Sequence, residues 1–104
     1  MNQPPEQKIR LDLNNPVFQR QLLNLEKQHQ KDVLATLRRL FNMTWSQVYE
    51  DKGLKWEAII SRKGPHGGRI YSFRIGKGFR GIAYREGSWL RLLSLHLGHD
   101  STYH

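Results

Sequence analysis

The chain has 104 residues, which is enough for one domain with a modest hydrophobic core and too few for two. Its 38% hydrophobic residues and three tryptophans predict a folded chain, and the lack of cysteine excludes disulfides and thiolate metal sites. No apolar run is long enough to span a membrane and the polar N-terminus is unlike a signal peptide, so a cytoplasmic protein without a membrane partner is expected.

The formal net charge of +8 is unevenly distributed along the chain. Residues 1–53 carry eight Lys or Arg and six Asp or Glu, whereas residues 54–104 carry nine and three. The excess of basic residues in the second half predicts a surface that meets phosphates or an acidic protein. A merely soluble basic surface with no special partner is the alternative interpretation.

The N-terminal part of the sequence predicts a leader, a strand and a helix. Residues 1–7, with two consecutive prolines, are expected to form a loose leader. Residues 8–13 alternate between polar and apolar and predict a short strand. Asn15 followed by proline is a typical helix start, and an apolar stripe then continues to about residue 27.

The middle of the chain predicts a second and a third helix and an edge strand. A second apolar stripe runs to residue 42, and whether the helix breaks at residues 28–30 or continues there is left open. Two antiparallel helices would form a hairpin that covers one face of a sheet. A capping box starting at Thr44 predicts a short helix that Gly53 ends. Residues 54–60 are expected to form an edge strand and residues 61–68 a mobile basic loop.

The C-terminal part predicts an antiparallel meander of three strands. The runs 69–75, 79–85 and 89–97 are apolar, β-branched or aromatic, and short glycine turns separate them. Alternation places Arg74 opposite Phe73, on the other face of the sheet. The fold class is therefore α+β, a short N-terminal strand and a helical hairpin packed on a small antiparallel sheet. The predicted core contains Leu11, Leu22, Leu37, Tyr71, Phe73, Leu93 and Leu95.

The basic residues of the meander are candidates for phosphate binding. Arg74 and Arg80 flank a tight turn on adjacent strands, so their guanidinium groups could converge on one phosphate, although ordinary surface arginines fit the pattern as well. His99 and Tyr103 follow the last strand, and an imidazole beside such arginines can act in general acid–base catalysis on a phosphodiester, as could His66 on the basic loop. The further candidate phosphate-binding residues are Lys63, Arg69, Lys77, Arg85 and Arg91.

Other motifs are weak. His96 and His99 with Asp100 have the residue types of metal ligands, but they lie at a strand end and lack the helical context of a zinc site. The His-Asp pair at 99–100 also lacks the helical scaffold of metal phosphohydrolases. The glycine turn at 76–78 does not have the Walker spacing. Neither a metal nor a cofactor is expected.

Two segments carry a family resemblance. In residues 71–84 a Tyr-x-apolar-Arg-apolar strand leads through a glycine turn to an aromatic residue, an arginine and a run ending in tyrosine. Residues 97–103 read Leu-Gly-His-Asp-Ser-Thr-Tyr. Both patterns, and the order of a leading strand, a helical hairpin and a short third helix, resemble the RelE/ParE family of type II toxins. The resemblance covers nearly the whole chain.

The resemblance implies the toxin of a toxin–antitoxin system that cleaves mRNA on the ribosome without a metal or cofactor, with a cognate acidic antitoxin as its partner in a possible hetero-oligomer. By position, Arg80 would bind the scissile phosphate, with Arg74 beside it. His99 would be the general base or acid, and Tyr103 would orient or stack on a base or take part in proton transfer. Asp100 stands where many RelE-like chains have arginine.

Three alternatives remain open at this point. A ParE-like poison of DNA gyrase has the same fold and cuts nothing, and fold alone cannot separate the two activities. The second alternative is a basic RNA-binding or ribosome-binding module without catalysis. The third is a cytosolic regulatory fragment.

Overall fold

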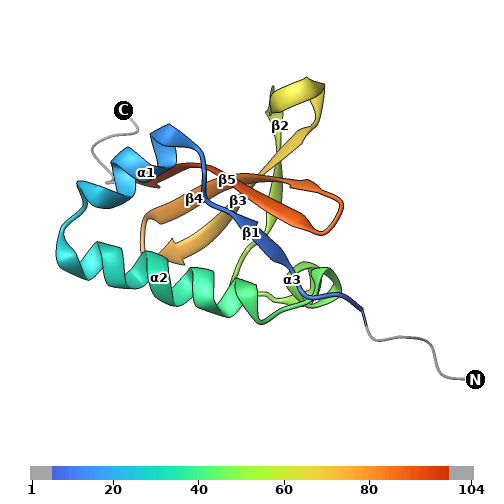
Figure 1. The fold of residues 1–104 in the computed structure, drawn as a ribbon, viewed down its shortest axis with the longest axis horizontal. Coiled ribbons are helices and arrows are strands. Elements are labelled where there is room, and N and C mark those ends of the chain that lie inside the picture. The colour runs from blue at the N-terminus through green and yellow to red at the C-terminus, as the bar shows by residue number, and fades with distance from the viewer. Residues whose placement is uncertain (1–5, 99–104) are drawn as a thin grey trace, which may run out of the picture.

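The computed structural model describes residues 6–98 and has the expected α+β fold, with helices packed on one face of a five-stranded sheet (Figure 1). The α1–α2 hairpin lies along this face and α3 closes one end of it. The elements are β1 (Arg10–Asp12), α1 (Pro16–Leu23), α2 (Lys27–Phe41), α3 (Trp45–Glu50), β2 (Glu57–Lys63), a 3₁₀ turn η1 (Pro65–Gly67), β3 (Arg69–Gly76), β4 (Phe79–Glu86) and β5 (Trp89–Leu97).

The predicted antiparallel sheet is present, and the N-terminal strand, whose pairing was not predicted, adds to it in parallel, so the sheet is mixed. Its strand order is β1-β5-β4-β3-β2, and the three strands of the predicted meander pair antiparallel as neighbours. The short strand β1 pairs parallel with β5, with Leu11 opposite Leu90. Strands joined by tight turns must run antiparallel, but β1 and β5 are separated by the rest of the fold, so their pairing is free to be parallel.

The helical hairpin breaks at residues 24–26, which is N-terminal to the segment where a break was considered. The side chain of Asn15 accepts hydrogen bonds from the backbone N–H groups of Val17 and Phe18 and so starts α1 as predicted. Asn24 ends α1, because its side-chain amide donates to the carbonyl of Arg20, 2.8 Å away. The second helix then begins at Lys27.

The third helix starts at the predicted capping box but ends before Gly53. Thr44 accepts from the backbone N–H of Gln47, and the Gln47 side chain accepts from the backbone N–H of Thr44. Leu54 is fully buried, and its carbonyl accepts from the backbone N–H of Arg74 at 2.7 Å. Leu54 therefore anchors the loop, and the edge strand lies at Glu57–Lys63, three residues beyond the predicted 54–60.

One hydrophobic core lies between the helices and the sheet. Of the predicted core residues, Leu37, Phe73 and Leu95 are buried. Leu11 and Leu22 are partly buried against the same core. Tyr71 is partly buried as well, and its ring stacks on Trp56 with the ring centroids 4.8 Å apart.

Leu93 was wrongly placed in the core. In the β4–β5 ladder Ile82 pairs with Ser94 and Ala83 pairs with Leu92, so Leu93 is an extra residue in β5. Such a β-bulge reverses the alternation of side chains on either side of it. Leu92, rather than Leu93, is therefore buried in the core, and Leu95 still points to the helices beyond the bulge.

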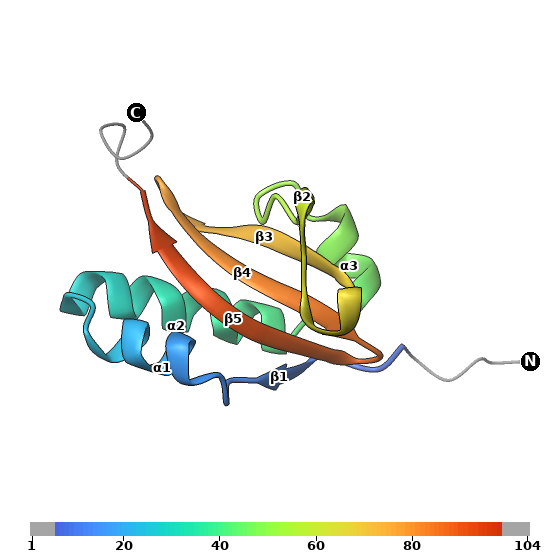
Figure 2. The ribbon, with the colours of Figure 1, turned by 90° about the horizontal axis from the view of Figure 1, so that it is seen from above.

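The other face of the sheet is partly covered by an arm formed from β2 and η1. Figure 2 shows this arm crossing above β3 and β4 on the side opposite α1 and α2. Ile70 and Ile82 are buried although they are not part of the main core. A Cβ on Gly64 in the arm would collide with the Ile70 side chain, which shows how closely the arm approaches the sheet there. The remainder of this open face holds the candidate site.

Candidate phosphate-binding face

The strand register places Arg74, Arg80 and His96 side by side on three adjacent strands. Arg74 on β3 pairs with Arg80 on β4, and Arg80 pairs with His96 on β5. Residues that pair directly across a sheet point to the same face, so the three side chains form one row. This row, here called the phosphate row, lies on the face opposite the core, because Phe73 beside Arg74 and Leu95 beside His96 are buried.

The turn between β3 and β4 positions the two arginines. Gly78 adopts a φ of +66°, which favours glycine, and a Cβ there would lie 2.7 Å from the carbonyl oxygen of Gly98. The backbone N–H of Gly98 donates to the carbonyl of Gly78 at 2.6 Å. The end of β5 is thereby fixed to the turn, and this contact holds His96 next to Arg80.

Four cations surround a hollow of about 280 Å³ at this turn, and Lys55 joins the predicted Arg74, Lys77 and Arg80 there. Lys55 reaches the hollow because Leu54 is bonded to the backbone of Arg74. All four residues are exposed, and within residues 6–98 none of them forms an ion pair. Like charges directly opposite in a sheet destabilise it, so this concentration of positive charge does not serve the fold.

His96 supplies a titratable group in the phosphate row. Its Nε2 lies 2.9 Å from the hydroxyl oxygen of Ser94, two residues earlier on the same strand face. Partial burial of the ring lowers the pKa of His96, and the positive charge of Arg62 on the arm lowers it further. The ring is therefore neutral at neutral pH and can accept a proton.

The arm carries a second basic group. Lys63 and Arg69, both predicted phosphate-binding residues, line a hollow of about 410 Å³ between β2 and the start of β3, together with Arg62. The ladder between these strands skips from the pair Ala58–Tyr71 to the pair Lys63–Arg69, and this irregularity opens the hollow. These cations are not part of the phosphate row. Arg62 nevertheless affects the row, because its positive charge lowers the pKa of His96.

Two of the predicted phosphate-binding arginines are engaged inside the fold. Arg91 forms ion pairs with Asp12 and with Glu86, which link β5 to β1 and to its own hairpin. Arg85 lies on the core side, with its guanidinium carbon 4.5 Å from the centre of the Trp45 ring. It also donates to the carbonyl of Gly87. Neither arginine joins the phosphate row.

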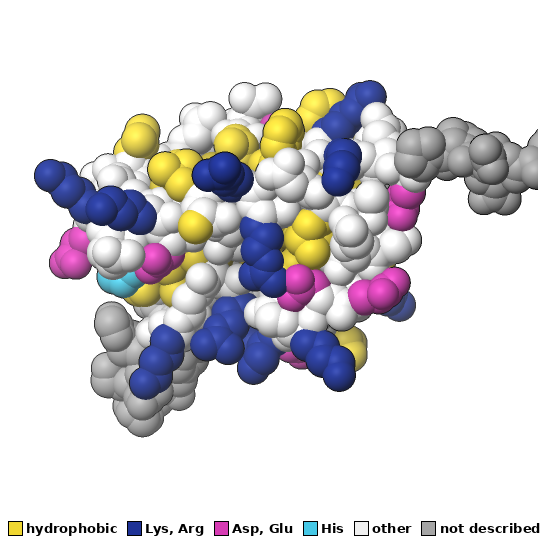
Figure 3. Space-filling view, turned by 90° about the horizontal axis from the view of Figure 1, so that it is seen from below, with side chains coloured by type: hydrophobic (Ala, Val, Ile, Leu, Met, Phe, Trp, Pro, Cys, Tyr) yellow, Lys and Arg dark blue, Asp and Glu magenta, His cyan; other side chains and the backbone are white. Residues whose placement is uncertain are grey.

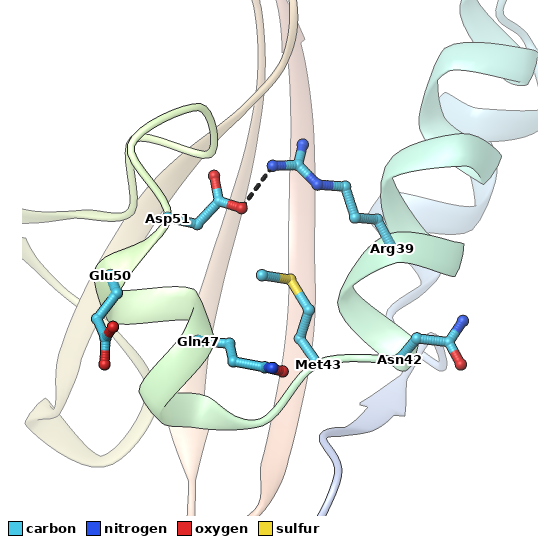
Figure 4. A pocket seen from close by; sticks show the side chains of 6 residues that line it. All are labelled: Arg39, Asn42, Met43, Gln47, Glu50 and Asp51. Atoms are coloured by element: carbon cyan, nitrogen blue, oxygen red, sulfur yellow. Dashed lines mark hydrogen bonds and ion pairs between the residues drawn. The ribbon is translucent and has the colours of Figure 1, made fainter.

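A hollow of about 530 Å³ lies between the end of α2 and α3 (Figure 4). Figure 4 shows Arg39 extending from α2 toward Asp51, and the two form an ion pair of 2.6 Å. Gln47 is used by the capping box of α3. Asn42 donates to the carbonyl of Arg38 in its own helix. The Arg39–Asp51 ion pair ties the end of α3 to α2, so these groups serve the fold.

The remaining predicted site residues, His99 and Tyr103, lie outside residues 6–98. The predicted phosphate-binding and catalytic residues did not include His96, which is in the row, or Lys55 and Arg62, which lie near it. His96 alternates with Leu95 and Leu97 in the sequence, and this pattern could have placed it on the open face. Lys55 and Arg62 come near the row through contacts between residues distant in sequence.

Within residues 6–98 no group of three or more His, Asp or Glu side chains is placed to hold a metal ion. No helix in that range has the length and apolar character needed to cross a membrane. Comparisons with protein-family models, with curated proteins and with solved structures found no match. The function is therefore inferred from the phosphate row and from the sequence resemblance.

Proposed function

We propose that the protein is the toxin of a type II toxin–antitoxin system and acts as a ribosome-dependent mRNA endonuclease of the RelE/ParE type. The observation that carries this proposal is the phosphate row, in which a neutral imidazole and two arginines that have no ion-pair partner within residues 6–98 occupy one line across three strands. The ribosome, the mRNA and an acidic antitoxin come from the resemblance of residues 71–84 and 97–103 to this family.

In the proposed reaction the ribose 2′-hydroxyl attacks the adjacent phosphorus, and the bond from phosphorus to the 5′-oxygen breaks. The products are a 2′,3′-cyclic phosphate and a 5′-hydroxyl end. One proton leaves the 2′-oxygen and one is delivered to the 5′-oxygen, so the step consumes neither an oxidant nor a cofactor. Arg74 and Arg80 bind the phosphate and stabilise the negative charge that develops on it.

His96 is the proton-transfer group that the geometry supports within residues 6–98. It stands next to Arg80 in the row, so a phosphate held by Arg80 lies beside its ring. When Nε2 donates to Ser94, Nδ1 is the basic nitrogen that can take the proton of the 2′-hydroxyl. The sequence resemblance assigned this role to His99, and His96 is a second candidate that stands on the structure.

The test compares the unmodified protein with Arg80→Ala on translating ribosomes that carry a defined mRNA. Because removal of one charge-stabilising group typically lowers a rate by about 10²–10³-fold, cleavage should fall to that extent. Folding stability should change by less than about 0.5 kcal/mol, since the side chain is exposed. Lys52→Ala is the matched control, because Lys52 is also an exposed cation but does not line the hollow at the turn.

The products decide between the candidate functions. Cuts that appear only in translated messages and leave 2′,3′-cyclic phosphate ends support the proposal. An SOS response without mRNA cuts in cells would point to a gyrase poison. Binding to ribosomes or RNA without any cut would leave a non-catalytic module. Full cleavage by Arg80→Ala at equal expression would refute the assignment of the phosphate row.

A further inference from the structure

The outer face of α2 carries a stripe of basic and apolar side chains that the fold does not use. Residues spaced alternately by four and three positions lie on one side of a helix. The five residues that this spacing defines are all exposed, and together they are called the outer stripe. It consists of Lys27, Lys31, Leu34, Arg38 and Phe41.

The core-facing side of α2 is already complete without the outer stripe. Val33, Leu37 and Leu40 are buried against the sheet. Leu34 and Phe41 each keep 58% of their surface exposed. Single exposed apolar residues are common, but these two are seven positions apart, about 10.5 Å along the axis, which matches the repeat of a partner helix.

The charges on the outer stripe are of one sign and are available. In residues 6–98 Lys27, Lys31 and Arg38 form no ion pair. The acidic residue of α2, Asp32, accepts a hydrogen bond from Gln28 and is not on the stripe. Figure 3 views the molecule from below Figure 1, the side on which α2 lies, and there basic, hydrophobic and acidic side chains are interspersed.

We infer that the outer stripe binds an acidic amphipathic helix of a partner protein. Apolar side chains of that helix would cover Leu34 and Phe41, and its Asp and Glu residues would pair with the flanking cations. A second copy of this chain does not fit, because its own stripe would oppose like charges. A purely polar ligand does not fit either, because it would leave both apolar side chains in water.

This inference does not depend on RNA cleavage, because the outer stripe shares no residue with the phosphate row. The stripe is on α2, which lies on one side of the sheet (Figure 2), whereas the phosphate row lies on the sheet face opposite the core and the helices. An acidic helix on the outer stripe would therefore leave the phosphate row uncovered. If the partner is the antitoxin, a different segment of it must act at the phosphate row.

The test uses a displayed library of helical peptides of about 20 residues, since shorter isolated helices are marginal in water. Peptides selected on the full-length protein are measured by fluorescence anisotropy against matched variants. We expect enriched sequences to be acidic, with apolar residues at intervals of three and four. Leu34→Ser and Phe41→Ser should each weaken their binding about tenfold, because each exposed half of an apolar side chain would otherwise be buried.

Charge reversal and a control complete the design. Arg38→Glu should weaken the selected peptides at least as much, and rising salt should weaken their binding to the unmodified protein. Ile60→Ser is the control, because Ile60 is 96% exposed on β2, on the opposite side of the sheet. Thermal unfolding of each variant verifies that the fold is intact.

The contrary outcomes are distinct. Peptides that bind Leu34→Ser and Phe41→Ser as well as the unmodified protein would overturn the inference, as would selection of neutral or basic sequences. Concentration-dependent dimers that Phe41→Ser abolishes would assign the stripe to a second copy. Single-stranded RNA binding that Arg38→Glu weakens but Leu34→Ser does not would assign it to nucleic acid. None of these results would alter the cleavage test at Arg80.

Discussion

Gly81→Ala tests the register on which the phosphate row depends. Gly81 lies on β4 between Arg80 and Ile82, and it pairs with Phe73 on β3. A Cβ at Gly81 would lie 2.6 Å from Cε1 and 2.9 Å from Cε2 of the Phe73 ring, and closer still to Cζ. Real Cβ atoms do not approach other atoms so closely, so the ring or the strand must shift to admit the methyl group.

The structure gives the ring little room to move. Phe73 is 1% exposed, and its ring stacks against Trp56 with the centroids 6.0 Å apart. Overpacking of a core typically costs about 1–3 kcal/mol, and the close contact with three ring atoms places Gly81→Ala near the upper end of that range. At roughly 4–8 °C per kcal/mol for a domain of this size, the melting temperature should fall by about 10–20 °C.

Urea unfolding followed by tryptophan fluorescence measures this loss. Gly68→Ala is the control, because its φ of −75° suits alanine and its Cβ would find the Pro65 carbonyl oxygen at an ordinary 3.6 Å. The double variant Gly81→Ala/Phe73→Leu should lose less stability than the sum of the two single changes, because the smaller side chain makes room for the methyl group.

A contrary result would also call the strand register, and so the position of Arg80, into question. If Gly81→Ala changed the free energy of unfolding by less than about 0.5 kcal/mol and showed no coupling to Phe73→Leu, the Phe73 ring could not lie over Gly81. A one-residue slip of β4 would then be the simplest explanation, and it would turn Arg80 toward the core. The phosphate row would lose its structural basis, and with it the proposed reaction.

Three further predictions concern chemistry and charge. His96→Gln should retain ribosome binding but lower cleavage by about 10²-fold or more, and parallel loss of both in binding and cleavage assays would make His96 a docking residue. Arg62→Ala should raise the pKa of His96, because it removes a positive charge that disfavours the imidazolium. The acid limb of the pH profile of the cleavage rate should therefore move to higher pH. An acid limb that does not move would exclude His96 as the base. Lys77→Met should weaken RNA binding and reduce its salt dependence, whereas Arg91→Met should leave RNA affinity unchanged because Arg91 is held by ion pairs. Equal effects of both changes in a filter-binding titration would contradict the assignment of Lys77 to RNA binding and of Arg91 to the fold.

Much of the phosphate row was predictable because it depends on local patterns. Side chains alternate between the two faces of an uninterrupted strand. Once residues 69–75 are assigned to a strand, Phe73 is expected to face the core and Arg74 the open side. The tight turn then set Arg80 opposite Arg74. The capping side chains of Asn15 and Thr44 similarly fixed where two helices begin.

The errors arose where the chain departs from a regular period. The bulge at Leu93 reverses the alternation of β5, and no residue at that position requires a bulge in the way that glycine marks a turn. The edge strand was placed three residues early, because the buried Leu54 reads like the start of a strand although it anchors a loop to Arg74. These features are set by tertiary contacts.

The side chains that pair with each arginine also could not be predicted from the sequence, and these pairings separate the structural arginines from those free to bind a ligand. Arg85 and Arg91 belong to the same basic meander as Arg74 and Arg80, but the fold stacks the first on Trp45 and neutralises the second with Asp12 and Glu86. Where a cation serves stability, this protein supplies a partner for it.

At the turn between β3 and β4 the opposite holds, because like charges face each other and residues 6–98 supply no ion-pair partner for any of the four cations there. A cross-strand pair of like charges destabilises a sheet by a few tenths of a kcal/mol or more. An aromatic or β-branched pair at the same position would stabilise the sheet by a similar amount. A negatively charged ligand reduces that repulsion when it binds, so binding of a phosphate lowers the free energy of this part of the surface. The same arrangement that weakens the free protein therefore favours binding of a phosphate, as the proposed cleavage of RNA requires.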